Sequence, residues 1–93
     1  MKVAWDEHKR QRSLVERGLD FADAKKVLLG DQYTFRDDRR EYGELRYITA
    51  GYLEGRFVVV TWTPRHGGPR IISMRHGHDQ EEERYREQMG RSG

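Results

Sequence analysis

Arg56 to Thr63 reads RFVVVTWT and is the strongest strand signal in the chain. β-Branched and aromatic side chains fill almost every position, and these residue types favour extended backbone. The stretch is nearly continuously apolar, which is typical of a strand buried on both faces of a sheet. We therefore expect it to be a central strand, around which the rest of the fold is arranged.

Turn residues flank this strand on both sides. Glu54-Gly55 predicts a tight turn before it, and His66-Gly67-Gly68-Pro69 predicts a turn after it. The preceding segment, 44–53, contains good strand residues, and the following segment, Arg70 to Arg75 (RIISMR), is a third strand candidate. A weaker strand is expected over 32–36. Short connections between consecutive strands predict an antiparallel meander.

Helical patterns lie at both ends of the chain. Residues 6–16 are expected to form a first helix, followed by Gly18, and a second is expected from Asp20 to Gly30. Residues from His78 onward predict a C-terminal helix, and 90–93 a frayed tail. We expect an α+β fold in a single domain, 1–93, with two N-terminal helices on a three- to four-stranded antiparallel sheet and a short C-terminal helix.

Composition narrows the class of protein. The chain has no cysteine, so disulfides and thiolate zinc sites are excluded and a reducing cytoplasm is the expected location. No apolar run is long enough to span a bilayer, and the N-terminus lacks the apolar core of a signal peptide, so no membrane contact is expected. Arginine outnumbers lysine 14 to 4. Because the guanidinium binds phosphate through a planar fork, this excess favours a phosphate-containing partner.

Several arginines occupy strand ends. Arg70 and Arg75 would face opposite sides of a regular strand, and they can meet only because each lies at an end of the segment. Arg46 lies near the start of another strand. Arg46, Arg70 and Arg75 would form a phosphate-binding surface, together with Arg65 and His66 in the turn that precedes Arg70. The alternative is that the arginines are solvated strand-edge charges, paired with Glu44 or Glu54 at little net energy.

Other chemical motifs are weak. His76-Gly77-His78-Asp79 resembles a run of metal ligands only superficially, because no cysteine and no further ligands accompany it, and we expect no metal. One of His66, His76 or His78 could transfer protons near neutral pH, although a surface loop residue is the favoured interpretation of each. The sequence has no phosphate-binding loop and no nucleophile elbow. The acidic pairs Asp37-Asp38 and 81–83 are interpreted as solvated charges.

Five fragments in register carry a family resemblance. They are Trp5-Asp6-Glu7-x-Lys9, Gly18-x-x-Phe21-x-x-Ala24, Gly43-Glu44-x-Arg46, Arg70-Ile71-Ile72-Ser73-x-Arg75, and Glu83-Arg84-Tyr85. In this order and spacing the chain resembles the BrnT family of toxins, from Val3 to about Tyr85.

The resemblance implies a function and a set of partners. BrnT proteins are type II toxins with a RelE-like ribonuclease fold, which inhibit translation by cleaving RNA without a metal or other cofactor. A BrnA-like antitoxin, a small DNA-binding protein of the ribbon–helix–helix type, neutralises the toxin. The complex represses its own operon, so operator DNA is contacted only through the antitoxin complex.

On this resemblance, specific residues acquire roles. We expect Arg46, Arg70 and Arg75 to hold the scissile phosphate, and Glu44 or His66 to act as base or acid. Arg65, Arg56 and Tyr47 are candidates for contacts with RNA.

A competing hypothesis is a non-catalytic co-repressor that binds nucleic acid or the antitoxin. Its motivation is two departures from the family pattern, because Ser13 stands where asparagine is common and Arg17 where histidine is common.

Overall fold

A five-stranded mixed sheet forms the centre of the computed structural model, which describes residues 1–91. The strands are β1 (Ala4–Trp5), β2 (Gln32–Arg36), β3 (Tyr47–Leu53), β4 (Arg56–Arg65) and β5 (Gly68–His76). Their order across the sheet is β1-β5-β4-β3-β2, so the RFVVVTWT segment is central, as predicted. Strands β2 to β5 form the expected antiparallel meander.

The expected sheet of three to four antiparallel strands was wrong at one edge. Strand β1 adds a fifth strand and pairs parallel with β5, with Ala4 opposite Arg70. Two residues are too few to show the alternation on which strand prediction depends. Strand boundaries also differ. β3 begins only at Tyr47, β4 continues to Arg65, which was expected in the turn, and β5 begins already at Gly68, which leaves His66-Gly67 as the turn.

The helices are α1 (Glu7–Arg17), the 3₁₀ helix η1 (Phe21–Asp23), α2 (Ala24–Leu29) and α3 (Asp79–Arg91). The predicted second helix is thus divided into a 3₁₀ turn, capped by the Asp20 carboxylate, and six α-helical residues. The C-terminal helix is not short. It includes Gly90 and Arg91, which were expected to be frayed, while 92–93 lie outside the described residues. Within residues 1–91, none of the helices has the length and apolar character needed to cross a membrane.

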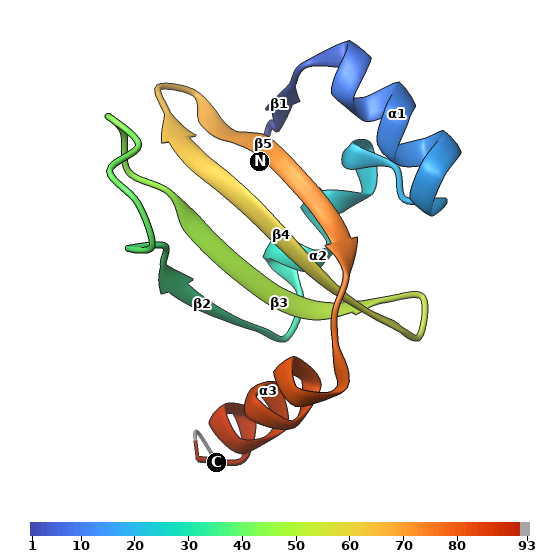
Figure 1. Cartoon of the computed structure of the whole chain (residues 1–93), viewed down its shortest axis with the longest axis vertical. Coiled ribbons are helices and arrows are strands. Elements are labelled where there is room, and N and C mark those ends of the chain that lie inside the picture. Colours follow the sequence, from blue (N-terminus) through green and yellow to red (C-terminus); the bar gives the residue numbers. More distant parts are fainter. Residues whose placement is uncertain (92–93) are drawn as a thin grey trace.

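The sheet separates two apolar clusters. On one face, Val58, Val60 and Met74 pack against residues of η1 and α2. On the opposite face, Ile48, Ala50, Phe57 and Val59 pack against Tyr85 of α3, and we call this side the α3 face. Figure 1 shows α2 behind the sheet, α1 beside the β5 edge, and α3 across one end of the near side. Within residues 1–91, the rest of the α3 face carries no helix.

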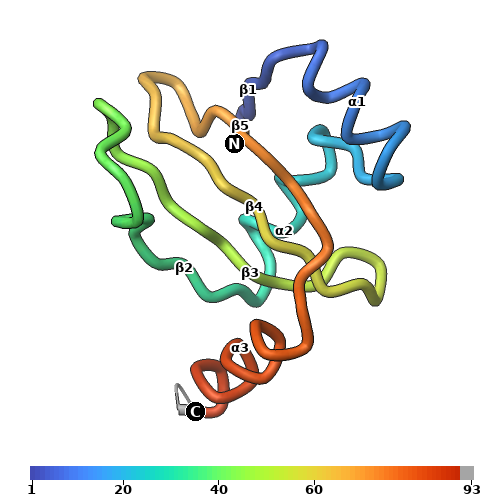
Figure 2. The backbone as a smooth tube through the Cα atoms, in the orientation of Figure 1, coloured from blue at the N-terminus to red at the C-terminus, as the bar shows by residue number. Residues whose placement is uncertain are grey.

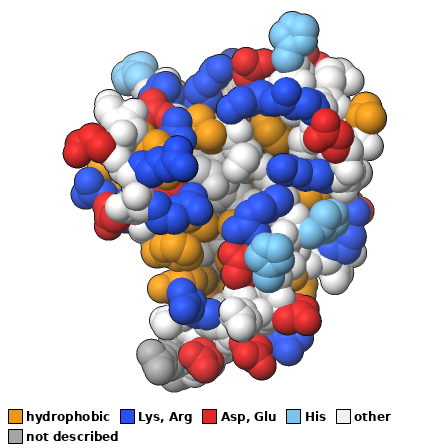
Figure 3. All heavy atoms as spheres, in the orientation of Figure 1, with side chains coloured by type: hydrophobic (Ala, Val, Ile, Leu, Met, Phe, Trp, Pro, Cys, Tyr) orange, Lys and Arg blue, Asp and Glu red, His pale blue; other side chains and the backbone are white. Residues whose placement is uncertain are grey.

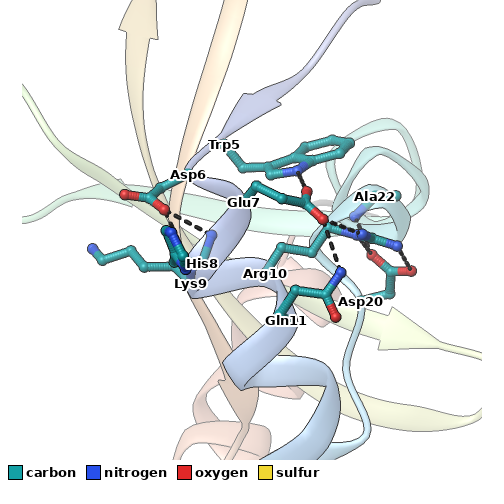
Figure 4. A network of polar contacts seen from close by, with 9 residues as sticks. All are labelled: Trp5, Asp6, Glu7, His8, Lys9, Arg10, Gln11, Asp20 and Ala22. Atoms are coloured by element: carbon teal, nitrogen blue, oxygen red, sulfur yellow. Dashed lines mark hydrogen bonds and ion pairs between the residues drawn. The ribbon is translucent and has the colours of Figure 1, made fainter.

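A polar network fixes α1 relative to the chain that follows it (Figure 4). The Arg10 guanidinium donates to both carboxylate oxygens of Asp20, at 2.8 and 3.1 Å. Glu7 accepts from Arg10 and from the indole nitrogen of Trp5 in β1. The Asp6 side chain caps the first turn of α1. The first of the five family fragments therefore has a structural role.

Helix α1 also covers the outer edge of β5 beyond β1. Lys9 Nζ donates to the Ile72 carbonyl at 3.4 Å, and Arg17 Nη1 donates to the Met74 carbonyl at 2.8 Å. Ser13 is buried and donates to the Leu19 carbonyl. Unpaired strand edges invite pairing with other chains, and these contacts block that edge. The two departures from the family pattern, at Ser13 and Arg17, thus make backbone contacts that support the fold.

Two leucines offer a matched test of the core. Leu19 is fully buried, whereas Leu29 is 62% exposed. Leu19→Ala should lower the free energy of unfolding by about 2–5 kcal/mol because it leaves a cavity in a packed core. Leu29→Ala should change it by less than about 0.5 kcal/mol. Urea unfolding followed by circular dichroism measures both, and equal effects would contradict the described packing.

Candidate active site

A slip in the β4–β5 register determines where the arginines of β5 point. Trp62 pairs with Ile71, but Thr61 pairs with Ser73, so Ile72 has no partner on β4. The extra residue is a β-bulge, which shifts the alternation of side chains along one strand. Arg70 therefore lies opposite Thr63, and Arg75 opposite Val59. Since Thr63 and Val59 share a face of β4, Arg70 and Arg75 share one too, which is the α3 face.

This side of the sheet carries a concentration of positive charge. Figure 3, which views the α3 face, shows Lys and Arg side chains gathered over the sheet above α3. Alternation along β4 places Arg65 on this side with Thr63, and alternation into β3 places Arg46 there with Ile48. We call these residues, Arg46, Arg65, Arg70 and Arg75, the arginine face.

Glu44 links two members of the arginine face. Its carboxylate accepts from Arg46 Nε at 3.0 Å and from Arg65 Nη2 at 3.1 Å. Figure 2 shows how this contact arises, because the 37–46 loop and the β4–β5 turn lie at the same end of the sheet. Hydrogen bonds from Arg46 and then Arg65 hold the pKa of Glu44 below its usual value. Glu44 is therefore an ionised acceptor near neutral pH.

A buried carboxylate organises the loop beside this cluster. Asp37 is only 5% exposed and accepts from the Arg39 guanidinium at 2.8 Å and from the Tyr42 hydroxyl at 3.0 Å. The Tyr42 ring in turn lies 4.2 Å from the Arg46 guanidinium carbon, a cation–π contact. Hydrogen bonds from Arg39 are the main cause of the strongly lowered pKa of Asp37. Through Tyr42, this loop fixes the position of Arg46.

Arg75 is held by the first turn of α3. Its two terminal nitrogens donate to the two carboxylate oxygens of Glu81 at 2.9 and 2.8 Å. Glu81 also accepts from the backbone of His78. The bond with Arg75 is the main cause that lowers the pKa of Glu81 to about 2, and it raises the pKa of Arg75. By contrast, the Arg70 guanidinium forms no hydrogen bond or ion pair with the residues that the structure describes.

The other predicted site residues are not all at this face. His66 lies in the exposed turn directly after Arg65. Arg56 lies at the opposite end of β4, and its register partner Leu53 belongs to the apolar cluster on the face opposite the α3 face. Tyr47 stacks on Trp62, with ring centroids 5.0 Å apart, also on the face away from α3. The structure thus brings together Arg46, Arg65, Arg70, Arg75 and Glu44 on one face, and it places Arg56 and Tyr47 elsewhere.

Sequence reasoning missed several residues of this site. Asp37 and Glu81 were interpreted as solvated charges, which was wrong for both, since Asp37 is buried and Glu81 is paired with Arg75. Arg39 and Tyr42 were not singled out. The spacing Asp37-x-Arg39 was the available signal, because an aspartate in a turn often accepts a hydrogen bond from the backbone two positions later, as Asp37 does from Arg39. The contact of Arg75 with Glu81 had no local signal, because it depends on how α3 returns to the sheet.

The described residues offer no candidate metal site. Among residues 1–91, no group of three or more histidine, aspartate or glutamate side chains is arranged so that it could hold a metal ion.

The fold and the arginine face together define the class of protein. It is a small α+β protein whose open sheet face presents arginines suited to nucleic-acid phosphates. A family model described as "Ribonuclease toxin, BrnT, of type II toxin-antitoxin system" matches residues 5–81. The chain therefore belongs to the BrnT family of ribonuclease toxins. The comparison with curated proteins gives no match.

The pair of Arg75 and Glu81 predicts a specific dependence of stability on pH. Because folding lowers the pKa of Glu81 from 4.5 to about 2, its contribution is complete above pH 4.5 and is lost as the pH falls toward 2. Glu81→Gln should therefore flatten the loss of stability between these values, measured as urea midpoints at several pH values. Glu87→Gln, at an exposed position of the same helix, is the control and should leave the profile unchanged. A wild-type profile in Glu81→Gln would contradict the assignment.

Proposed function

We propose that this chain is an endoribonuclease toxin that cleaves RNA at the arginine face without a metal ion, and that it inhibits translation in the cytoplasm by this cleavage. The observation that carries the proposal is the shared face of Arg70 and Arg75, in a chain that belongs to a family of ribonuclease toxins. A single-stranded RNA backbone laid on this face would meet guanidinium groups along its path.

The proposed reaction is an internal transfer at phosphorus. The RNA 2′-oxygen attacks the adjacent phosphate, the bond from phosphorus to the 5′-oxygen breaks, and the products end in a 2′,3′-cyclic phosphate and a 5′-hydroxyl. Negative charge accumulates on the phosphate oxygens in the transition state, and arginines aimed at that charge supply the electrostatic stabilisation. Arg70 is available for this role because its guanidinium has no partner among the described residues. Arg46 bonds to Glu44 only through Nε, so its two terminal nitrogens can also bind phosphate.

Two proton transfers complete the reaction. We assign Glu44 to accept the proton of the 2′-hydroxyl, because its lowered pKa keeps it ionised at neutral pH. The same low pKa makes Glu44 a weak base, so the arginines must supply most of the rate acceleration. His66, in the turn beside Arg65, is our candidate for donating a proton to the leaving 5′-oxygen.

The proposed antitoxin is a BrnA-like protein with a DNA-binding ribbon–helix–helix part. A type II system has a protein antitoxin, and an acidic surface on that protein would complement the arginine face. Covering this face would block RNA, and the antitoxin would bring the complex to operator DNA.

Substitution of the β5 arginines tests the proposed function. Induced in a heterologous bacterium, the wild-type chain should stop growth and degrade RNA, whereas Arg70→Ala and Arg75→Ala should not. With purified protein, each substitution should lower the cleavage rate by about 10²–10³-fold, as loss of one transition-state donor does. Arg12→Ala, at an exposed position of α1, is the matched control.

Thermal unfolding checks that the variants are folded, which the comparison requires. Full toxicity and full cleavage in both β5 variants would place the site elsewhere. RNA binding without any cleavage by the wild-type chain would favour the co-repressor hypothesis instead.

A further inference from the structure

A cavity of about 250 Å³ opens on the α3 face where α3 meets the sheet. Its floor is apolar and consists of the buried residues Ile48, Ala50 and Val59. Tyr33 and Phe35 of β2 form one wall, with ring centroids 5.5 Å apart. Figure 3 shows exposed hydrophobic side chains between the positively charged area and α3. An apolar floor with an aromatic wall is suited to a flat ring.

The rim of this cavity is polar, and two of its side chains have no partner among the described residues. Gln80 and Arg84 line it from α3, and both are exposed. Neither forms a hydrogen bond or ion pair with the residues that the structure describes. Glu81 also lines the cavity, but its carboxylate is held by Arg75. The free amide of Gln80 and the free fork of Arg84 can therefore bind the edge of a ring that enters the cavity and stacks against its aromatic wall.

The cavity is continuous with the arginine face. Val59 in the floor lies directly opposite Arg75 in the sheet. Ile48 in the floor is two positions after Arg46 on the same side of β3, a spacing of about 7 Å along a strand. Consecutive phosphates of a single strand are separated by a similar distance, so a base placed in the cavity leaves its own phosphates at the arginines.

We propose that this cavity binds one unpaired purine base of the RNA substrate, and that the base is guanine. This inference rests on the proposed function and adds the specificity site. Proteins recognise unpaired RNA bases by stacking them on aromatic rings and bonding their edges. Guanine presents two adjacent acceptors, O6 and N7, which match the two parallel donors of an arginine fork. Phe35 stacks the base, and Arg84 selects it.

The test uses short 2′-O-methyl oligouridylates, which lack the attacking hydroxyl, with one central guanosine, adenosine or abasic position. The wild-type chain should bind the guanosine oligomer about 5- to 150-fold more tightly than the abasic one, the range expected for a stacked base. Phe35→Ala should remove most of this difference, and Arg84→Ala should remove the preference for guanosine over adenosine.

Two control variants match these substitutions. Leu14 is 39% exposed on α1, close to the 40% of Phe35, so Leu14→Ala controls for loss of an exposed apolar side chain. Arg86 lies on the same helix as Arg84 but bonds to Glu82, so Arg86→Ala controls for loss of a charge from α3. Both should retain the guanosine preference.

The outcomes separate the two proposals. Equal affinity for the guanosine and abasic oligomers, in a chain that cleaves RNA, would overturn the base site and leave the proposed function intact. A guanosine preference lost in Phe35→Ala and Arg84→Ala, in a chain that cleaves no RNA, would support the base site and refute the ribonuclease. If Phe35→Ala weakens binding of the co-expressed antitoxin but not the base preference, the cavity belongs to the antitoxin and the inference fails.

Discussion

One unpaired residue, Ile72, is the constraint on which the proposed site depends. Without the bulge in β5, Arg70 and Arg75 would face opposite sides of the sheet, and only one of them could belong to the arginine face. The Ile72 carbonyl points to the outer edge of β5, where Lys9 of α1 donates to it. A contact of the first helix thus supports the irregularity that aligns the arginines of the last strand.

Carboxylates keep the remaining arginines in place. Glu44 joins Arg46 to Arg65, and Glu81 fixes Arg75 to the start of α3. Each pair contributes little to the free energy of folding, since guanidinium and carboxylate stay partly exposed, but it restricts long side chains to one geometry. In the proposed site, charge pairs would therefore position these arginines before RNA arrives, while Arg70 has no such pair among residues 1–91 and is available to phosphate.

The central strand, the meander and the helix positions could be predicted from sequence because periodicity and turn residues are local signals. Strand β1 could not, since two residues show no period. The arginine cluster was foreseen in its members Arg46, Arg65, Arg70 and Arg75, yet the reason for their shared face was not, because a bulge depends on pairing with another strand. The burial of Asp37 and the pairing of Glu81 with Arg75 could not be predicted either, because burial and long-range partners are properties of the folded chain.

The most direct measurement of the central claim is a double-mutant cycle of Arg70 and Arg75 on the rate of RNA cleavage by the purified chain. If both arginines stabilise the same phosphate in the transition state, Arg70→Ala/Arg75→Ala should lose much less rate than the product of the two single losses, because groups that act as a unit are not additive. Single losses that multiply without any coupling would contradict a shared phosphate, and a single variant with wild-type rate would remove that arginine from the site.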